Sequence, residues 1–290
     1  MSDRGNAAVG LLEDFSLEMT GKDLEALAAA GRVIPQGTRI NVTFLGNEDL
    51  DTRCAAAEAI TQAGFVPVPH ISARRLHSEV ELRTFLERLR AIGATEKVFI
   101  IGGDPATPAG PYADSLSVIA SGILPEYGVR EVGVAGYPEG HPDIGADVLW
   151  AALEGKIAAI ESQGLTASIT TQFAFDTDAV LTWITSVRGR DITAPIRIGT
   201  PGPAGIKRLL GFARRFGIGA NATIVKKYGF SLTNLLGSAG PDRFVTATAD
   251  ALAEHDQSAA VGLHFYTFGG LQATASWVEA FTANPEMERR

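Results

Sequence analysis

Residues 97–136, KVFIIGGDPATPAGPYADSLSVIASGILPEYGVREVGVAG, are the clearest guide to the architecture of this chain. They contain two short runs rich in β-branched residues, KVFII at 97–101 and EVGVA at 131–135, and an Ala- and Leu-containing helical pattern lies between them. Runs of this kind are typical of strands that are buried on both faces. A buried strand, a helix and a second buried strand indicate two neighbouring parallel strands joined by a crossover helix.

The same alternation extends over the whole chain. Amphipathic stretches such as Asp51–Ala63 and Val80–Ile92, with apolar residues three and four apart, separate the apolar runs. We identify eight such runs: Phe15–Met19, Arg39–Phe44, Val66–His70, Lys97–Ile101, Glu131–Ala135, Ser168–Gln172, Pro195–Gly199 and Gly262–Tyr266. Eight strand–helix units in 290 residues predict one closed (β/α)8 barrel, the TIM barrel, as a single domain over residues 1–290. An open doubly wound sheet is the alternative.

Two segments fit this pattern less well. Pro67 and Pro69 lie in the third run, and each proline removes a donor from the strand ladder. The interval between Gly199 and Gly262 is too long for one helix, so we expect it to hold two helices or a short strand at Ala222–Val225.

Composition and charge narrow the class of protein. The chain is 46% apolar, carries a formal charge of −8 and has Cys54 as its one cysteine, which excludes a disordered tail and a disulfide scaffold. An acidic chain argues against binding to nucleic acid or to an anionic membrane surface. The sequence has neither a signal-peptide pattern nor an apolar run long enough to span a bilayer. We therefore expect a cytoplasmic enzyme.

Polar side chains stand at the predicted carboxyl ends of the strands, where the active sites of such barrels lie. They are Glu18, Thr43, His70, Asp104, Tyr137, His141, Gln172 and Tyr266. Structural explanations exist for some of them. Asp104 precedes a proline as turn residues do, His141 could cap a helix that starts near Asp143, and His70 could be a core histidine. Glu18 is harder to explain in this way, because burying a carboxylate without a partner is costly.

Other familiar motifs are absent or misleading. The sequence has no GxxxxGK[ST] phosphate loop and no HExxH motif. Residues 217–222 match GxGxxA, but they follow a basic helical pattern rather than a strand, so a dinucleotide fingerprint is not expected there. His70, Asp104, Glu139 and His141 do not have the spacing of a zinc motif, and we expect no metal.

Seven segments, in order along the chain, resemble the 5,10-methylenetetrahydrofolate reductase family. They are FSLE at 15–18, PH at 69–70, GDP at 103–105, YADSL at 112–116, YPEGHP at 137–142, TQFAFD at 171–176 and HFYT at 264–267. YPEGHP and TQFAFD are the specific ones. The family consists of flavin-dependent barrel enzymes and includes a short bacterial type without a long C-terminal regulatory domain.

The resemblance implies FAD as the cofactor, a tetrahydrofolate substrate and NAD(P)H as the other substrate. It implies that FAD contacts Thr43, His70, Gly103, Asp104, Tyr112, Ala113, Ala135, Tyr137, His141, Asp147 and Lys156. It also implies that Gln172, Phe212 and Tyr266 hold the folate beside Glu18. The family habit further implies a homo-oligomer.

In the reaction that the resemblance implies, hydride passes from the nicotinamide to the flavin and then to the folate in a ping-pong cycle. Glu18 is the expected general acid for the folate amine, and Asp104 is expected to tune the flavin.

The chain also departs from the family pattern. Gly102 replaces an arginine, and Lys156 is the one cation in the AALEGKIAAIE stretch, where the family has a basic cluster. Gly269 and Gly270 replace an Asn-Arg pair. These departures leave two alternatives open, a tetrahydrofolate-binding methyltransferase and a non-catalytic paralogue, neither with a flavin.

Overall fold

The computed structural model describes residues 3–46, 48–215, 238–255 and 260–283. Within them, eight parallel strands close into a barrel in the order β1-β10-β7-β6-β5-β4-β3-β2. The strands are β1 Ser16–Met19, β2 Arg39–Val42, β3 Val66–Ser72, β4 Lys97–Ile101, β5 Glu131–Gly136, β6 Thr166–Thr171, β7 Ile196–Pro201 and β10 Val261–Tyr266. The predicted (β/α)8 barrel is confirmed, and the open-sheet alternative is wrong.

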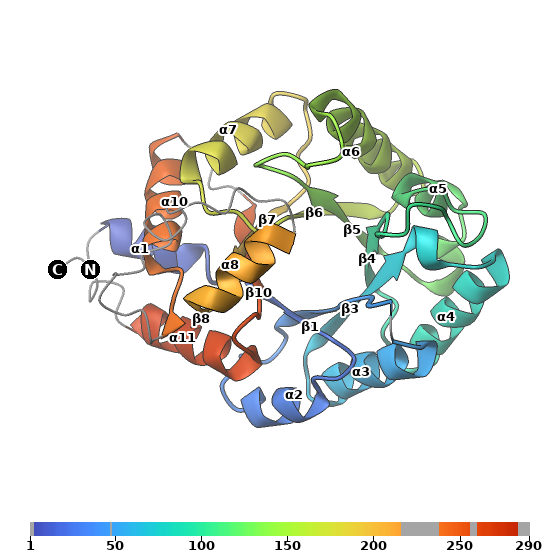
Figure 1. Cartoon of the computed structure of the whole chain (residues 1–290), viewed down its shortest axis with the longest axis horizontal. Helices are drawn as coiled ribbons and strands as arrows, with labels where there is room; N and C mark the ends of the chain where they lie inside the picture. The colour runs from blue at the N-terminus through green and yellow to red at the C-terminus, as the bar shows by residue number, and fades with distance from the viewer. Residues whose placement is uncertain (1–2, 47, 216–237, 256–259, 284–290) are drawn as a thin grey trace.

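Helices surround the barrel on the outside (Figure 1). They are α1 Asp3–Gly10, α2 Leu24–Ala30, α3 Leu50–Gln62, α4 Glu79–Ala91, α5 Ser115–Ala120, α6 Ala146–Glu161, α7 Thr177–Arg188, α8 Ile206–Arg215, α10 Asp242–Glu254 and α11 Leu271–Ala283, with short 3-10 turns η1 at Ala73–Arg75 and η2 at Leu124–Tyr127. A two-stranded antiparallel pair, β8 Ala204–Gly205 and β9 Ser238–Ala239, flanks α8. None of the described helices is long and apolar enough to cross a membrane.

The prolines of β3 are accommodated by the direction in which they point. The Val66 amide donates to the carbonyl of Thr38, just before β2, so Val66, Val68 and His70 direct their amides to that side. Pro67 and Pro69 then face β4, and the ladder between β3 and β4 starts only at His70, opposite Phe99. The missing donors therefore fall where no ladder forms, and the third strand is confirmed.

Among the residues that the structure describes between β7 and β10 are the helices α8 and α10, so this interval holds more than one helix, as expected. The strand considered at Ala222–Val225 lies outside the described residues. The Arg208 side chain on α8 donates to the carbonyl of Phe268, 2.8 Å away, so α8 lies beside the loop that follows β10. This places α8 at the carboxyl end of the barrel.

Ionic side chains occupy the amino-terminal end of the barrel. Glu131, the first residue of β5, pairs with Arg39 at 2.8 Å and with Lys97 at 2.9 Å, and Arg197 on β7 pairs with Asp14. Charged groups that are taken out of water need partners, and these ion pairs supply them. The cluster therefore has a structural role at the amino-terminal end of the barrel. The carboxyl end of the barrel is where a reaction site can form.

Candidate active site

Glu18 lies at the carboxyl end of β1, and neighbouring elements fix the backbone around it. The Thr267 hydroxyl donates to the carbonyl of Glu18, and the Thr43 amide donates to the carbonyl of Met19 at 2.9 Å. The Glu18 side chain is 18% exposed. It is thus a half-buried carboxyl at the inner edge of the barrel mouth, as the sequence predicts.

His264 on β10 lies beneath this carboxyl. Its Nε2 atom is 3.4 Å from Glu18 Oε2, and its Nδ1 atom is 2.8 Å from the Ser16 hydroxyl. His264 and Ser16 are each only 1% exposed. When the Ser16 hydroxyl donates to Nδ1, the ring proton lies on Nε2 and points at Glu18. In the sequence, His264 was only part of the HFYT motif, and its contact with Glu18 was not predicted. The contact depends on the pairing of Ser16 with His264 across the first and last strands.

His70 on β3 is a buried, neutral member of the same cluster. Its Nε2 atom is 3.1 Å from the Asn41 amide nitrogen, and its ring lies 4.8 Å from that of Phe99. Burial lowers the pKa of His70 to about 4. The nearby Glu18 carboxylate acts to raise this pKa, and His264 acts to lower it further. His70 is therefore both a packed core histidine and a neighbour of the proposed acid.

Tyr266 and Gln172 lie close together at the ends of β10 and β6. The Tyr266 hydroxyl donates to the carbonyl of Thr171 at 3.1 Å, and the Gln172 side-chain oxygen accepts from the Phe173 amide at 3.1 Å. Burial, the Glu18 charge and Tyr137 raise the pKa of Tyr266 well above its ordinary value, so its hydroxyl stays protonated. A Cβ on Gly199 would lie 2.8 Å from the Tyr266 ring, and glycine at that position leaves room for it.

Asp104 lies on the rim rather than inside the barrel. Its side chain is 78% exposed and accepts from the Arg75 guanidinium at 2.5 Å. Gly103 beside it has a φ of +91°, and a Cβ there would collide with the Ser72 hydroxyl. Sequence reasoning did not single out Arg75, which follows His70 in the chain and reaches Asp104 across the βα loops.

Arg74, the neighbour of Arg75, ties down the segment that follows Asp104. Its guanidinium donates to the carbonyls of Ala113 at 2.8 Å and Pro105 at 3.2 Å. Ala113 is exposed, whereas Tyr112 is buried at 6% exposure. Arg74 therefore joins both ends of this segment to the turn that follows β3.

Lys156 is buried on α6, only 7% exposed. Burial lowers its pKa to about 8, and the attraction of Asp114, the N-cap of α5, opposes that shift only in part. An ammonium group in contact with a strong anionic partner would have its pKa raised instead. Lys156 is thus a buried lysine on α6 whose charge is only partly balanced by the described residues around it.

The segment after β5 carries Tyr137 and His141, whose rings meet edge to face at 5.4 Å. Burial raises the pKa of Tyr137. The helix cap considered for His141 is wrong: the His141 Nδ1 atom accepts from the Asp143 amide within a turn, and α6 begins later, at Ala146 with Gly145 as its N-cap. Pro142, Asp143, Ile144 and the N-cap Gly145 thus lie between His141 and the helix.

Glu139, in the same segment, has a structural role that the sequence did not reveal. Its carboxylate accepts from the backbone amides of Phe175 at 2.8 Å and Asp176 at 3.1 Å. This joins the loop after β5 to the loop after β6. The two specific motifs of the sequence, YPEGHP and TQFAFD, therefore meet in space.

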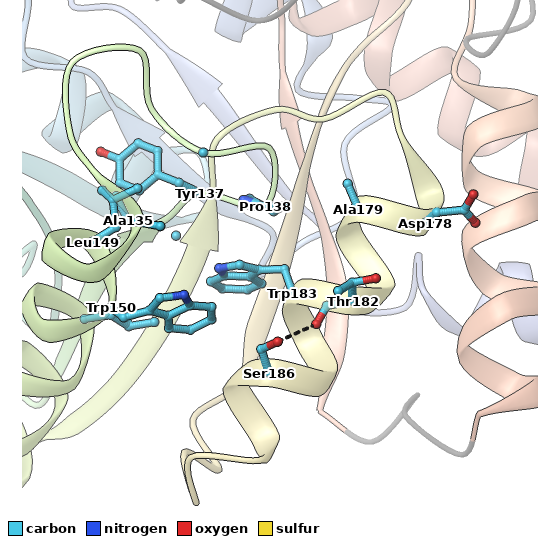
Figure 2. A pocket seen from close by; sticks show the side chains of 14 residues that line it. Ala135, Tyr137, Pro138, Leu149, Trp150, Asp178, Ala179, Thr182, Trp183 and Ser186 are labelled. Atoms are coloured by element: carbon cyan, nitrogen blue, oxygen red, sulfur yellow. Dashed lines mark hydrogen bonds between the residues drawn. The ribbon is translucent and has the colours of Figure 1, made fainter.

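A pocket of about 460 Å³ opens beside these loops, between α6 and α7 (Figure 2). Ala135 and Tyr137 contribute to its wall, together with Trp150 and Trp183. Asp147 is exposed in the first turn of α6. The side chain of Phe212, on α8, lies outside the described residues, so its predicted contact stays a prediction. Within the part of the chain that the structure describes, no three His, Cys, Asp or Glu side chains cluster as metal ligands.

Solved structures match this chain over most of its length, and three of them illustrate the likeness. Two are dihydropteroate synthase from Thermus thermophilus, one of them in complex with 6HMPPP. Both have a TM-score of 0.48 and 13% identity, with 93% and 94% of this chain covered and the same shares of theirs. The third, tryptophan synthase from Mycobacterium tuberculosis, has a TM-score of 0.42 and 13% identity over 86% of this chain and 98% of its own.

The sequence itself matches the family described as methylenetetrahydrofolate reductase over residues 19–280. That range includes His70, Asp104, Tyr137, Gln172 and Tyr266, and it starts one residue after Glu18. The match covers most of the chain and supports a folate-related oxidoreductase. With its closed barrel and the polar cluster at its mouth, the chain belongs to the methylenetetrahydrofolate reductase family.

Proposed function

We propose that the protein interconverts 5,10-methylenetetrahydrofolate and 5-methyltetrahydrofolate by ping-pong hydride transfer, with FAD as cofactor and NAD(P)H as the other substrate. The observation that carries this proposal is the half-buried carboxyl of Glu18 at the barrel mouth, held by His264 and flanked by Tyr266. In this proposal, Glu18 is the acid that the bound folate needs.

The rim offers a cradle for a flavin. Gly103 takes a backbone conformation that favours glycine, and the buried Ser72 hydroxyl against it has no partner among the described residues. A Cβ on Gly102 would meet open space, so the backbone there is approachable. These features fit a flat ring system that needs close backbone approach and hydrogen bonds.

The residues proposed to hold FAD are the rim set given by the family resemblance: Thr43, His70, Gly103, Asp104, Tyr112, Ala113, Ala135, Tyr137, His141 and Asp147. Lys156 fits this role least, because its ammonium is buried and its pKa is lowered. Arg75 is a cation on the rim itself, and we propose that it supplies the positive charge that the family's arginine would give at position 102, where this chain has glycine.

FAD, when bound, supplies the two-electron hydride chemistry that links nicotinamide to folate. The chain supplies the proton. Opening the five-membered folate ring leaves an amine nitrogen that must be protonated. Glu18 donates that proton from the inner edge of the barrel mouth. The Tyr266 hydroxyl stays protonated and His70 stays neutral. Glu18 is therefore the proposed proton donor among these three neighbours. Gln172 and Phe212 complete the proposed folate site.

Asp104 has a second proposed role, to oppose negative charge on the reduced cofactor and so favour hydride release. Its ion pair with Arg75 neutralises that effect as long as the two groups stay in contact. We therefore expect Arg75 to turn from Asp104 toward the cofactor when the site is filled.

The substitution Glu18→Gln tests the proposal. The amide cannot donate a proton as an acid, so reduction of the folate should fall by about 10²- to 10⁴-fold. Reduction of bound FAD by NAD(P)H should stay within a factor of about two, because that half-reaction does not use the proton. Glu25→Gln, the same change on the exposed side of α2, is the control. Stopped-flow absorbance separates the half-reactions, and an equal loss in both would show that Glu18 is not the acid.

A second candidate is a tetrahydrofolate-binding methyltransferase without flavin. The observation in its favour is the lack of exposed positive charge on α6, where Lys156 is the one cation and is buried. A diphosphate beside that helix would have weak electrostatic support. Folate binding without flavin binding would favour this candidate.

A further inference from the structure

A small cavity lies inside the barrel, between the Glu18 cluster and the ion pairs at the amino-terminal end. Ser16 and Asn41 line it on the side of the cluster, and Arg39, Glu131 and Arg197 line it on the side of the ion pairs. Its volume is about 20 Å³. A buried water molecule needs roughly 10–15 Å³ of such space, so the cavity can hold one water molecule and no larger ligand.

Arg197 on β7 brings an unpaired donor to this cavity. Its side chain is 8% exposed, and one of its terminal nitrogens pairs with Asp14. Its Nε atom is buried and has no hydrogen-bond partner among the residues that the structure describes. Arginine can donate hydrogen bonds but accept none, so the group that satisfies Nε must be an acceptor. Buried donors of this kind are nearly always satisfied, either by protein or by ordered water.

The carboxylate on the cavity wall favours a neutral acceptor over an anion. Arg39 donates to Glu131 at 2.8 Å, and Lys97 donates to the second oxygen of that carboxylate at 2.9 Å. Burial acts to raise the pKa of Glu131, but these two cations and the Ser168 hydroxyl together lower it, so Glu131 stays ionised. A second negative charge beside it would be repelled. Water can accept the hydrogen bond from Arg197 without adding a charge.

Ser16 connects the cavity to the candidate acid. Its hydroxyl group lies 2.8 Å from Nδ1 of His264, and Nε2 of His264 lies 3.4 Å from Glu18 Oε2. In the barrel, β10 lies between β1 and β7, so Ser16, His264 and Arg197 come from three consecutive strands. A molecule between Arg197 and Ser16 would therefore join the ion pairs to the Glu18 cluster through hydrogen bonds.

We propose that this cavity binds one water molecule, which accepts a hydrogen bond from Arg197 Nε and donates one to the Ser16 hydroxyl oxygen. Asn41 and Thr170, which also line the cavity, offer oxygen acceptors for the second hydrogen of the water. The inference rests on the proposed function, in which Glu18 is the acid. It makes Ser16 and Arg197 positioning residues for that acid.

The direction of the hydrogen bonds follows from the arginine, which can only donate. The water accepts from Arg197 and donates to Ser16, and Ser16 directs its own proton to His264 Nδ1. The ring proton of His264 then lies on Nε2 and is donated to Glu18 Oε2. The acid proton of Glu18 consequently lies on Oε1. When this proton passes to the folate nitrogen, the hydrogen bond from His264 stabilises the carboxylate that remains.

A crystal structure that shows ordered water tests the binding site. We expect one water molecule within about 2.7–3.2 Å of both Arg197 Nε and Ser16 Oγ. Val68→Ile adds a methyl group to the cavity wall and should displace the water. Val134→Ile adds the same group to a buried residue of β5 that does not line the cavity, and it should keep the water. A wild-type cavity without water, or with a chloride ion in its place, overturns the inference.

Nitrogen-15 NMR of the imidazole rings tests the direction of the hydrogen bonds in the resting protein. The chain has five histidines, and the signals of His264 are those missing from the spectrum of His264→Gln. We expect the proton of the neutral His264 ring on Nε2 and none on Nδ1. A proton on Nδ1 overturns the inference, because Ser16 would then accept from His264 instead of donating to it.

Ser16→Ala tests the positioning role, because it removes the donor to His264 Nδ1. We expect the single-turnover rate of folate reduction to fall by about fivefold or more, with the Kd for folate within about twofold of wild type. Ser162→Ala, the same change at the exposed end of α6, is the control. An unchanged rate in Ser16→Ala overturns the positioning role.

The three measurements separate this inference from the proposed function. A wild-type protein that has the water and the expected His264 tautomer but does not reduce folate overturns the proposed function and leaves the water site standing. A protein that reduces folate but holds no water in the cavity overturns the inference alone.

Discussion

At the scale of single residues, the candidate site consists of one carboxyl and the groups that hold it. Glu18 meets His264, His264 meets Ser16, and His70 and Tyr266 stay uncharged beside them. A half-buried carboxyl with a fixed neighbour on one side and an opening on the other is well placed to exchange a proton with a group bound at the opening. His264 is then a positioning residue for Glu18.

Two substitutions of His264 separate positioning from packing. In His264→Gln the side-chain amide can reach the place of Nε2 and keep the contact with Glu18. In His264→Asn the shorter amide can keep only the contact with Ser16. We expect the folate half-reaction to fall by about tenfold or more in His264→Asn and to stay near wild type in His264→Gln. FAD affinity should be unchanged in both. Equal folate rates in the two variants would contradict the positioning role.

Sequence reasoning succeeded for the residues that stand at strand ends. Glu18, His70, Gln172 and Tyr266 could be placed at the barrel mouth because the period of a strand and the rule of carboxyl ends fix their location. Arg75 and Asn41 could not be found in this way. Their partners, Asp104 and His70, are brought to them by the fold across different strands, and no local pattern carries that information.

At the scale of helices and strands, α6 shows where sequence patterns give too little. The helix begins at Ala146, whereas the reading of His141 as a helix cap expects it to start near Asp143. By contrast, the amphipathic stretch Val80–Ile92 agrees with α4, which is capped by Ile92 and followed by Gly93 with the positive φ of +70° that glycine accepts without strain. Helix boundaries that depend on local backbone conformation can thus be predicted from the sequence. Boundaries that depend on tertiary contacts cannot.

Lys156 on α6 gives a stability prediction. Its pKa falls from 10.5 to about 8, so the folded state holds the charged form at a cost, and stability rises as the pH increases from 8 toward 10.5. Lys156→Met removes that cost, and at pH 7 we expect the free energy of unfolding to rise by up to about 3 kcal/mol. Urea unfolding measures it, with the exposed Lys22→Met as the control. A fall in stability would show that the ammonium has a stabilising partner.

The same variant tests the expected cofactor contact. With the ammonium buried beneath α6, FAD affinity should change by less than about twofold in Lys156→Met, whereas a direct charge-assisted contact with FAD would cost about tenfold or more. The two measurements together separate a structural lysine from a ligand-binding one.

At the scale of the whole molecule, the barrel divides its polar groups between its two ends. Ion pairs centred on Glu131 fill the amino-terminal end, and the Glu18 cluster with the Gly103 rim occupies the other. Closure depends on the pairing of β1 with β10, which joins residues 248 positions apart at the Ser16–His264 contact. The sequence predicts eight strands and their helices. It cannot predict which side chains meet across that closure. The extent of the single domain, residues 1–290, and a homo-oligomer stay predictions.

Acid should weaken the fold through His70. In the folded protein its pKa is about 4, against an ordinary value of 6.5, so the unfolded chain binds the proton first. The stability that this group contributes is present above pH 6.5 and is lost as the pH falls toward 4, by about 3 kcal/mol in all. Urea unfolding of His70→Gln and of the exposed control His77→Gln at pH 7.5 and 4.5 checks this. A loss between the two pH values that is equal in both variants would contradict it.

The measurement that bears most directly on the flavin-dependent function is the visible spectrum of the purified protein, before and after incubation with excess FAD. The account predicts a flavin band that follows the protein through gel filtration, bleaches on addition of NADH or NADPH and returns when 5,10-methylenetetrahydrofolate is added. A protein that retains no flavin band after incubation with FAD would contradict the account and favour a folate-binding methyltransferase or a non-catalytic paralogue.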